Sequence, residues 1–167
     1  MIDFSLLEKV ESFKRLDKKQ LEAVRPFCEE VTFYLGDKLF TEGDDALHMW
    51  AVIEGQVDLR FEMPERGPAA AEQTITTIEV KEKEAEAKTL GWSCFVPPYK
   101  MRLSAYVVTD TCKIVRVAKN DLLRLFNDDP QMGYRFMSYM ITVVGYRFHQ
   151  FQAYVAKNLG EDLISGW

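Results

Sequence analysis

Apolar residues recur at helical spacing at both ends of the chain and at strand-like spacing in its middle. The spacing over residues 4–16 predicts a short amphipathic helix. Its apolar positions are Phe4, Leu7, Val10 and Phe13. Asp17 is typical of an N-cap and Gln20 stands in the capping-box position, so a second helix is expected over residues 18–28. Pro26 should bend that helix or end it early.

From residue 31 onward, short runs of β-branched and aromatic residues alternate with turn signals. The runs, in chain order, are VTFYL, KLFT, LHMWAVIE and QVDLRFE. The turn signals are Gly36-Asp37, Gly43-Asp44 and Gly55. A further strand is expected over residues 73–80, and a hairpin about Asp110 joins LSAYVVT to TCKIVRV. Strands this short, at this spacing, predict an antiparallel sandwich or barrel.

The stretch over residues 62–88 is richer in proline, glycine and charged residues than the strands around it. Pro64, Gly67 and Pro68 indicate an extended hairpin tip. The charge run over residues 81–88 is typical of a solvated strand end or loop.

Two helices are expected after the last strand. The first begins at Asn120 or Asp121, and the second runs from Pro130 to about Asn158. At roughly 42 Å, the second helix is longer than a small domain needs. Its first apolar stripe comprises Met137, Met140, Val144, Phe148, Phe151 and Val155, of which the first five form the predicted dimer face. Its second stripe comprises Phe136, Tyr139, Val143 and Tyr146.

One of these stripes can cover the sheet, and the other needs a second apolar surface to pack against. A twofold-related copy of the same helix would supply that surface, so a homodimer through the first stripe is expected. A helix buried wholly inside its own chain is the interpretation that stays open beside it.

Composition narrows the class of protein. The 167 residues fit one domain, or one domain plus a long accessory helix, and their 47% hydrophobic and 13% aromatic content favours a globular protein. A net charge of -5 argues against nucleic-acid binding, which usually needs a basic face. Three scattered cysteines without a CxxC pair predict a reducing, cytoplasmic location. Neither a signal peptide nor an apolar run of membrane-spanning length is expected.

The stretch TLGWSCFVPPYKMRLSA, residues 89–105, combines the elements of a phosphate cradle. Gly91 allows a sharp turn or a close backbone approach, and residues 92–95 could form one helical turn. The free N–H groups of such a turn suit an anion. Lys100 and Arg102 follow within reach of it.

With these elements in order, the chain resembles the cyclic nucleotide-binding domain family over roughly residues 5–155. That family includes the sensor half of catabolite activator protein and the regulatory subunits of cyclic-AMP-dependent kinase. The matching segments are residues 36–44, residues 47–57 ending in Glu54-Gly55-Gln56-Val57, the cassette position 91–105, and residues 121–126 followed by Pro130. The resemblance implies that residues 91–105 are the family's phosphate-binding cassette, called the cassette below.

The resemblance implies an α+β, mainly β fold. An antiparallel β-roll or jelly-roll barrel would be flanked by N-terminal helices and a long C-terminal helix. The expected organisation is N-terminal helices over residues 1–30, a β-roll over 31–118, C-terminal helices over 120–158 and a tail over 159–167. Residues 1–158 would then form the domain.

The resemblance also implies a ligand site in the cassette. Its residues are Gly91, Trp92, Ser93, Cys94, Lys100, Arg102, Leu103 and Ser104. Nucleotide-binding members have Gly-Glu at the cassette start, where the glutamate accepts from the ribose 2′-hydroxyl. Trp92 has no acceptor to replace it, a loss of roughly 10- to 100-fold in affinity. Trp92 would instead stack on a flat ligand or fill the ribose pocket.

The register of the phosphate-binding arginine is open. If Ser104 matches the family's threonine, the arginine position falls on Met101, and a shift of one residue brings Lys100 or Arg102 to it.

Three functional hypotheses follow. The first is a non-enzymatic sensor for a cyclic nucleotide or other small anionic ligand, which signals through its C-terminal helix to another polypeptide without direct DNA or membrane binding. The second is a ligand-free scaffold for dimerisation or docking. The third is a metal enzyme of the cupin type, for which only His48 and His149 are available. No cofactor, metal or catalytic residue is expected, and Cys94 is a redox thiol or, as we favour, a buried apolar residue.

Overall fold

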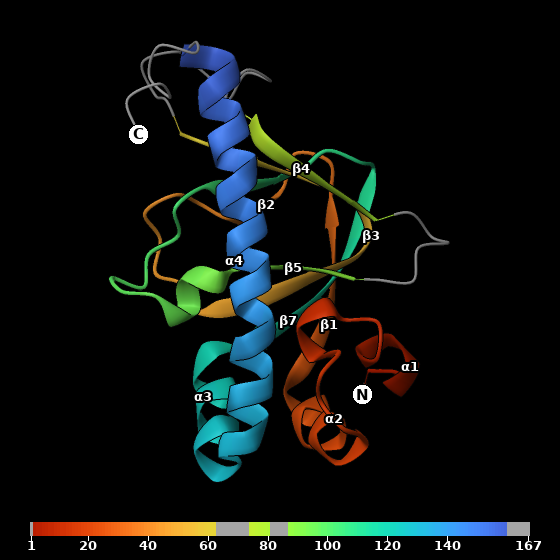
Figure 1. The fold of residues 1–167 in the computed structure, drawn as a ribbon. Coiled ribbons are helices and arrows are strands. Elements are labelled where there is room, and N and C mark those ends of the chain that lie inside the picture. Colours follow the sequence, from red (N-terminus) through yellow and green to blue (C-terminus); the bar gives the residue numbers. More distant parts are fainter. Residues whose placement is uncertain (1, 63–73, 81–86, 160–167) are drawn as a thin grey trace.

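The computed structural model describes residues 2–62, 74–80 and 87–159. They form an antiparallel β-roll with short helices at its N-terminal end and one long helix, α4, which runs along the length of the molecule (Figure 1). The predicted α+β, mainly β class is confirmed. The predicted hairpin tip, most of the charge run and residues 160–167 of the tail lie outside the described residues.

Seven strands make up the roll. They are β1 (Cys28–Tyr34), β2 (Lys38–Phe40), β3 (His48–Arg60), β4 (Thr74–Val80), β5 (Lys88–Leu90), β6 (Ser104–Val107) and β7 (Thr111–Ala118). The sheet order is β1-β7-β3-β6-β2, with β4 and β5 also paired to β3, and all these pairings are antiparallel. The two halves of β3 have different neighbours, β7 and β5 for the first and β4 and β6 for the second.

Gly55 lies inside β3, so the prediction of two strands separated by a turn is wrong. Its φ is +101°, and the register with β7 shifts between Val52 and Glu54. The strand therefore bends at Gly55 without ending. On one side of the bend β3 pairs with β7 and β5, and on the other side it pairs with β4 and β6. A glycine in a strand pattern signals such a bend as readily as a turn.

The N-terminal helices are shorter than predicted. The expected helix over residues 4–16 is wrong: α1 (Phe4–Leu7) and the 3-10 turn η1 (Glu11–Phe13) replace it. The break has a tertiary cause, since the backbone on either side of Val10 pairs with Ala87. The Glu11 N–H donates to the Ala87 carbonyl at 3.0 Å, and the Ala87 N–H donates to the Lys9 carbonyl at 2.8 Å.

The second helix confirms its sequence signals. Helix α2 (Lys18–Val24) begins at the capping box of Asp17 and Gln20, and the 3-10 turn η2 (Arg25–Phe27) ends it early at Pro26. The C-terminal pair is α3 (Lys119–Asp128) and α4 (Pro130–Leu159), which starts where Pro130 predicts. Helix α3 begins one residue before the predicted Asn120.

Two apolar cores position the site. One lies under the helices and holds Phe13, Leu122 and Phe136 among others. The other fills the inside of the roll and holds Trp50, Met101 and Ile114 among others. The interior of the roll is thus packed with the protein's own side chains.

The stripes of α4 divide between the protein's own core and its surface. From the second stripe, Phe136 and Val143 are buried in the helical core. From the first stripe, Met140 is also buried in its own chain, which removes it from the predicted dimer face. Phe148 and Phe151 remain exposed, at 57% and 41%. No helix in the described part of the chain is long and apolar enough to cross a membrane.

Candidate functional site

Gly91 brings the cassette against the start of β3. Its φ is +87°, a conformation that residues with a Cβ rarely adopt. A Cβ built there would lie 2.7 Å from the His48 carbonyl oxygen and 3.1 Å from Cδ1 of Trp50. The 3-10 turn η5 (Trp92–Phe95) follows at once, which confirms the predicted helical turn. Glycine is therefore required by backbone conformation and by space.

The returning arm of the cassette separates its two cations. Met101 is buried and its backbone pairs with the Gly43–Asp44 turn, through bonds of 2.9 and 2.8 Å. Lys100 on one side forms an ion pair of 2.6 Å with Asp45 and lines none of the three cavities described below. Arg102, on the other side, faces the space beneath α4.

Two adjoining cavities occupy that space. The smaller, of about 50 Å³, is lined by Phe40, Leu59, Leu90, Gly91, Trp92, Ser93, Met101, Arg102, Leu103 and Arg147. The larger, of about 290 Å³, is lined by Leu59, Phe61, Trp92, Arg102, Leu103, Val144, Arg147, Phe148 and Phe151. The cassette, the roll and α4 thus line one continuous site.

Arg147 is the residue that sequence reasoning missed. It comes from α4, lies half-buried and lines both of these cavities. Its guanidinium donates to Oε1 of Gln150 at 2.7 Å. Burial lowers the pKa of Arg147, an effect that the carboxylate of Glu11 opposes. Nothing in the sequence signals this role, because only the fold brings the far half of α4 over the cassette.

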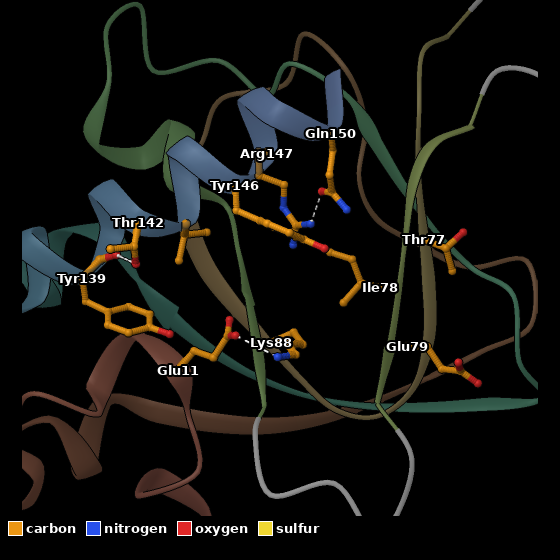
Figure 2. Close-up of a pocket in the computed structure, with 11 residues that line it drawn as sticks. Glu11, Thr77, Ile78, Glu79, Lys88, Tyr139, Thr142, Tyr146, Arg147 and Gln150 are labelled. Atoms are coloured by element: carbon orange, nitrogen blue, oxygen red, sulfur yellow. Dashed lines mark hydrogen bonds and ion pairs between the residues drawn. The ribbon is translucent and has the colours of Figure 1, made fainter. Parts of the chain in front are cut away.

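A third and larger cavity, of about 620 Å³, lies on the adjoining face of α4 and shares only Arg147 with the other two. Figure 2 shows Arg147 and Gln150 on its helix side, with Glu11 and Lys88 opposite. Lys88 pairs with Glu11 at 3.0 Å, so these charges neutralise each other. Because this cavity contains no cassette residue, and because two carboxylates, Glu11 and Glu79, line it, we place the candidate anion site in the two smaller cavities despite their size.

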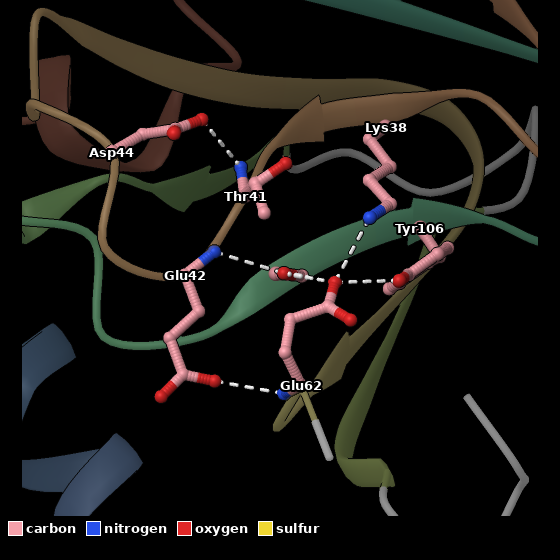
Figure 3. A network of polar contacts seen from close by, with 7 residues as sticks. Lys38, Thr41, Glu42, Asp44, Glu62 and Tyr106 are labelled. Carbon is pink, nitrogen blue, oxygen red and sulfur yellow. Dashed lines mark hydrogen bonds and ion pairs between the residues drawn. The ribbon is translucent and has the colours of Figure 1, made fainter. Parts of the chain in front are cut away.

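Ser104 belongs to a polar network at the end of β3, whose members Lys38, Glu42, Glu62 and Tyr106 are labelled in Figure 3. Its buried hydroxyl donates to the carboxylate of Glu62 at 2.6 Å and accepts from the Glu42 N–H at 2.9 Å. Tyr106 and Lys38 also donate to that carboxylate, at 2.6 and 2.9 Å. These donors, Ser104 first, lower the pKa of Glu62 to about 2. Ser104 therefore ties β6 to β3.

The chain was compared with known proteins. No protein-family profile and no curated protein matches it. A putative cyclic nucleotide-binding protein from Geobacter metallireducens GS-15 is similar in structure, with a TM-score of 0.72 and 21% identity over 89% of this chain and all of that one.

A cyclic nucleotide-binding domain from Methylobacillus flagellatus KT has a TM-score of 0.74 and 17% identity over 95% of this chain and 85% of that one. The chain has the fold of a cyclic nucleotide-binding domain. The regulatory domain of a Toxoplasma gondii cyclic-AMP-dependent kinase, solved with cyclic AMP, has a TM-score of 0.57 and 17% identity over 75% of this chain and 42% of that one.

Trp92 stands at the cassette start, directly after Gly91. Its half-buried ring packs against the helical core and lines both small cavities. The ring therefore fills space between the cassette and α4 and offers no hydrogen-bond acceptor.

The remaining predicted residues lie around this site. Ser93 and Cys94 are buried, and burial raises the pKa of the Cys94 thiol to about 11, which favours a packing role over a redox one. His48 lies on β3 beside Trp50, with ring centroids 5.5 Å apart, and His149 is exposed on α4. Among the described residues, no group of three or more histidine, cysteine, aspartate or glutamate side chains could hold a metal ion.

Proposed function

We propose that this protein is a regulatory module that binds a small anionic ligand, with cyclic nucleotides as the first candidates, between its cassette and α4. Ligand binding would shift α4 and so alter a homodimer or a docked partner protein. The module itself would carry out no catalysis.

The observation that carries this proposal is the shared lining of the two small cavities. Gly91, Trp92 and Arg102 come from the cassette, whereas Arg147 comes from α4. A ligand in contact with both elements changes their relative free energy, which is what a sensor requires. The similar structures named above include domains described as cyclic nucleotide-binding, which supports the choice of candidates.

The cation most suited to the anion is Arg102. It lines both cavities and forms no ion pair with any described carboxylate, whereas Lys100 is already paired with Asp45. A guanidinium can donate two parallel hydrogen bonds to a phosphate. Because Trp92 cannot accept from a ribose hydroxyl, we expect cyclic nucleotides to bind weakly, in the micromolar to millimolar range.

Thermal unfolding in the presence of cyclic AMP and cyclic GMP tests the proposal. A ligand at ten times its dissociation constant stabilises the folded state by about 1.4 kcal/mol. For a domain of this size, that raises Tm by about 3–6 °C. The titration should extend to about 10 mM nucleotide, so that weak binding is still detected.

Arg102→Gln and Lys100→Gln form a matched pair of variants for this experiment. We expect Arg102→Gln to weaken binding about 10- to 100-fold and Lys100→Gln to leave it unchanged. Equal losses in the two variants would contradict the assignment of Arg102. The absence of any shift with either nucleotide would rule out cyclic nucleotide sensing and leave other anions as candidates.

A ligand-free scaffold is the second candidate, and one observation favours it. The cavity beside the cassette has room for only about 50 Å³, and Met101 and Trp50 fill the roll behind it. Ligand pockets usually measure about 300–1,000 Å³. In this case the exposed apolar residues of α4 would carry the function through a partner.

A further inference from the structure

Two arginines line the same small space. Arg102 from the cassette and Arg147 from α4 border both the 50 Å³ cavity and the 290 Å³ cavity. Within the described residues, neither forms an ion pair with a carboxylate, and no aspartate or glutamate lines either cavity. In a chain with a net charge of -5, this is a local concentration of positive charge.

The two cavities differ in size and chemistry. The smaller has room for a few water molecules, which is also the room that one phosphate group needs. The larger is lined by apolar side chains apart from the two arginines, and Phe61, Trp92 and Phe151 are among them. An occupant of both would need a compact charged end and an apolar body.

We propose that the site takes a phosphomonoester with an apolar body, whose doubly charged headgroup is bound by Arg102 and Arg147 together. This deepens the proposed function, because it names the class of anion and a second binding residue. Arg147 is half-buried and Arg102 is exposed, and neither forms an ion pair with a described carboxylate. A cation without an ion-paired carboxylate is stabilised by an anion in contact with it, and the more so where it is buried. Two such cations are matched by two negative charges, and the single charge of a cyclic phosphodiester matches only one.

The inference also specifies what Arg147 does. Because Arg147 comes from α4 and Arg102 from the cassette, one headgroup bound to both joins the two elements directly. The charge of the headgroup then decides how strongly α4 is held.

Two probes isolate that charge. 1-Naphthyl phosphate carries a doubly charged headgroup at pH 8, and 1-naphthyl sulfate carries a singly charged headgroup on the same apolar body. Binding is measured by isothermal titration calorimetry, with cyclic AMP as a third ligand. We expect the phosphate to bind about tenfold or more tightly than the sulfate, because its second negative charge strengthens the charged hydrogen bonds from the two arginines.

Arg147→Gln should remove most of this preference, because the sulfate needs only one guanidinium. Arg147→Lys keeps the charge and should restore part of it, and Lys157→Gln, on the same helix, is the control. A purely structural role for Arg147 would weaken both naphthyl probes equally.

Equal binding of phosphate and sulfate by the wild-type protein would overturn the inference, as would an unchanged ratio in Arg147→Gln. Binding of cyclic AMP without either naphthyl probe would overturn it and leave the proposed function standing. Binding of the naphthyl phosphate alone would support the inference and exclude cyclic nucleotides. No binding of any probe would overturn both the inference and cyclic nucleotide sensing.

Discussion

Replacing Gly91 by alanine measures how tightly the cassette is held against β3. The new Cβ adds two separate costs. A positive φ costs an ordinary L-residue about 1–2 kcal/mol. The contact of 2.7 Å with the His48 carbonyl oxygen forces backbone to move, which in a packed interior costs about 1–3 kcal/mol more.

Gly36→Ala is the control that separates these two costs. Gly36 has a φ of +88°, nearly the same as the +87° of Gly91, but a Cβ there would meet no atom within 4 Å. Its replacement therefore carries the conformational cost alone. The difference between the two variants should be about 1–3 kcal/mol, which corresponds to about 2–12 °C in Tm for a domain of this length.

Urea denaturation followed by the fluorescence of the three tryptophans gives the free energy of unfolding of each variant. Thermal unfolding provides the independent comparison. If Gly91→Ala and Gly36→Ala are destabilised equally, the close approach of the cassette to β3 makes no contribution, and the reasoning that places Gly91 in the site is refuted.

Two further predictions concern the polar network around Glu62 and the exposed face of α4. Glu62→Gln should destabilise the protein by about 1 kcal/mol at pH 7. This is less than the roughly 1.5–3 kcal/mol of a buried charged hydrogen bond, because the side chain is 32% exposed. Since the folded-state pKa of about 2 lies below the ordinary 4.5, this contribution is present above pH 4.5 and disappears as the pH falls toward 2; thermal unfolding across that range checks it. Ile141 is 73% exposed, lies outside the three cavities and neighbours Met137 and Val144 of the predicted dimer stripe at helical spacing. Ile141→Glu should therefore shift a homodimer toward monomer in analytical ultracentrifugation.

Each of these two predictions has a contradicting result. A stability difference between Glu62→Gln and wild type that persists at pH 2 would mean that charge is not its source. For the dimer, Gln131→Glu places the same charge on an exposed position at the start of α4. A wild-type protein that is monomeric at all concentrations, or equal dissociation in the two variants, would exclude dimerisation through this face.

Local sequence signals predicted the elements whose cause is local. The capping box of Asp17 and Gln20 and the start of α4 at Pro130 depend on residues within one helical turn. The signal at Gly55 was also real, since a positive φ is present there. Whether the chain turns or bends at such a glycine depends on which strands pair beside it, and that information is not local.

The candidate site was predictable only on its cassette side. The glycine, the helical turn and the two nearby cations follow from adjacent residues. Lys100 and Arg102 differ in their surroundings because Asp45, far away in the sequence, pairs with Lys100. Arg147 could not be found from its surroundings in the sequence, because its neighbours only indicate an amphipathic helix.

The position of Arg147 bears on whether this fold can act as a sensor at all. A ligand shifts a conformational equilibrium only as far as its affinities for the two states differ. If the cassette alone held the ligand, every placement of α4 would bind it equally and no signal would result. Trp92 already connects the cassette with the helical core through apolar contact. An anion shared by Arg102 and Arg147 would add an interaction that depends on the placement of α4, which is the condition for signalling.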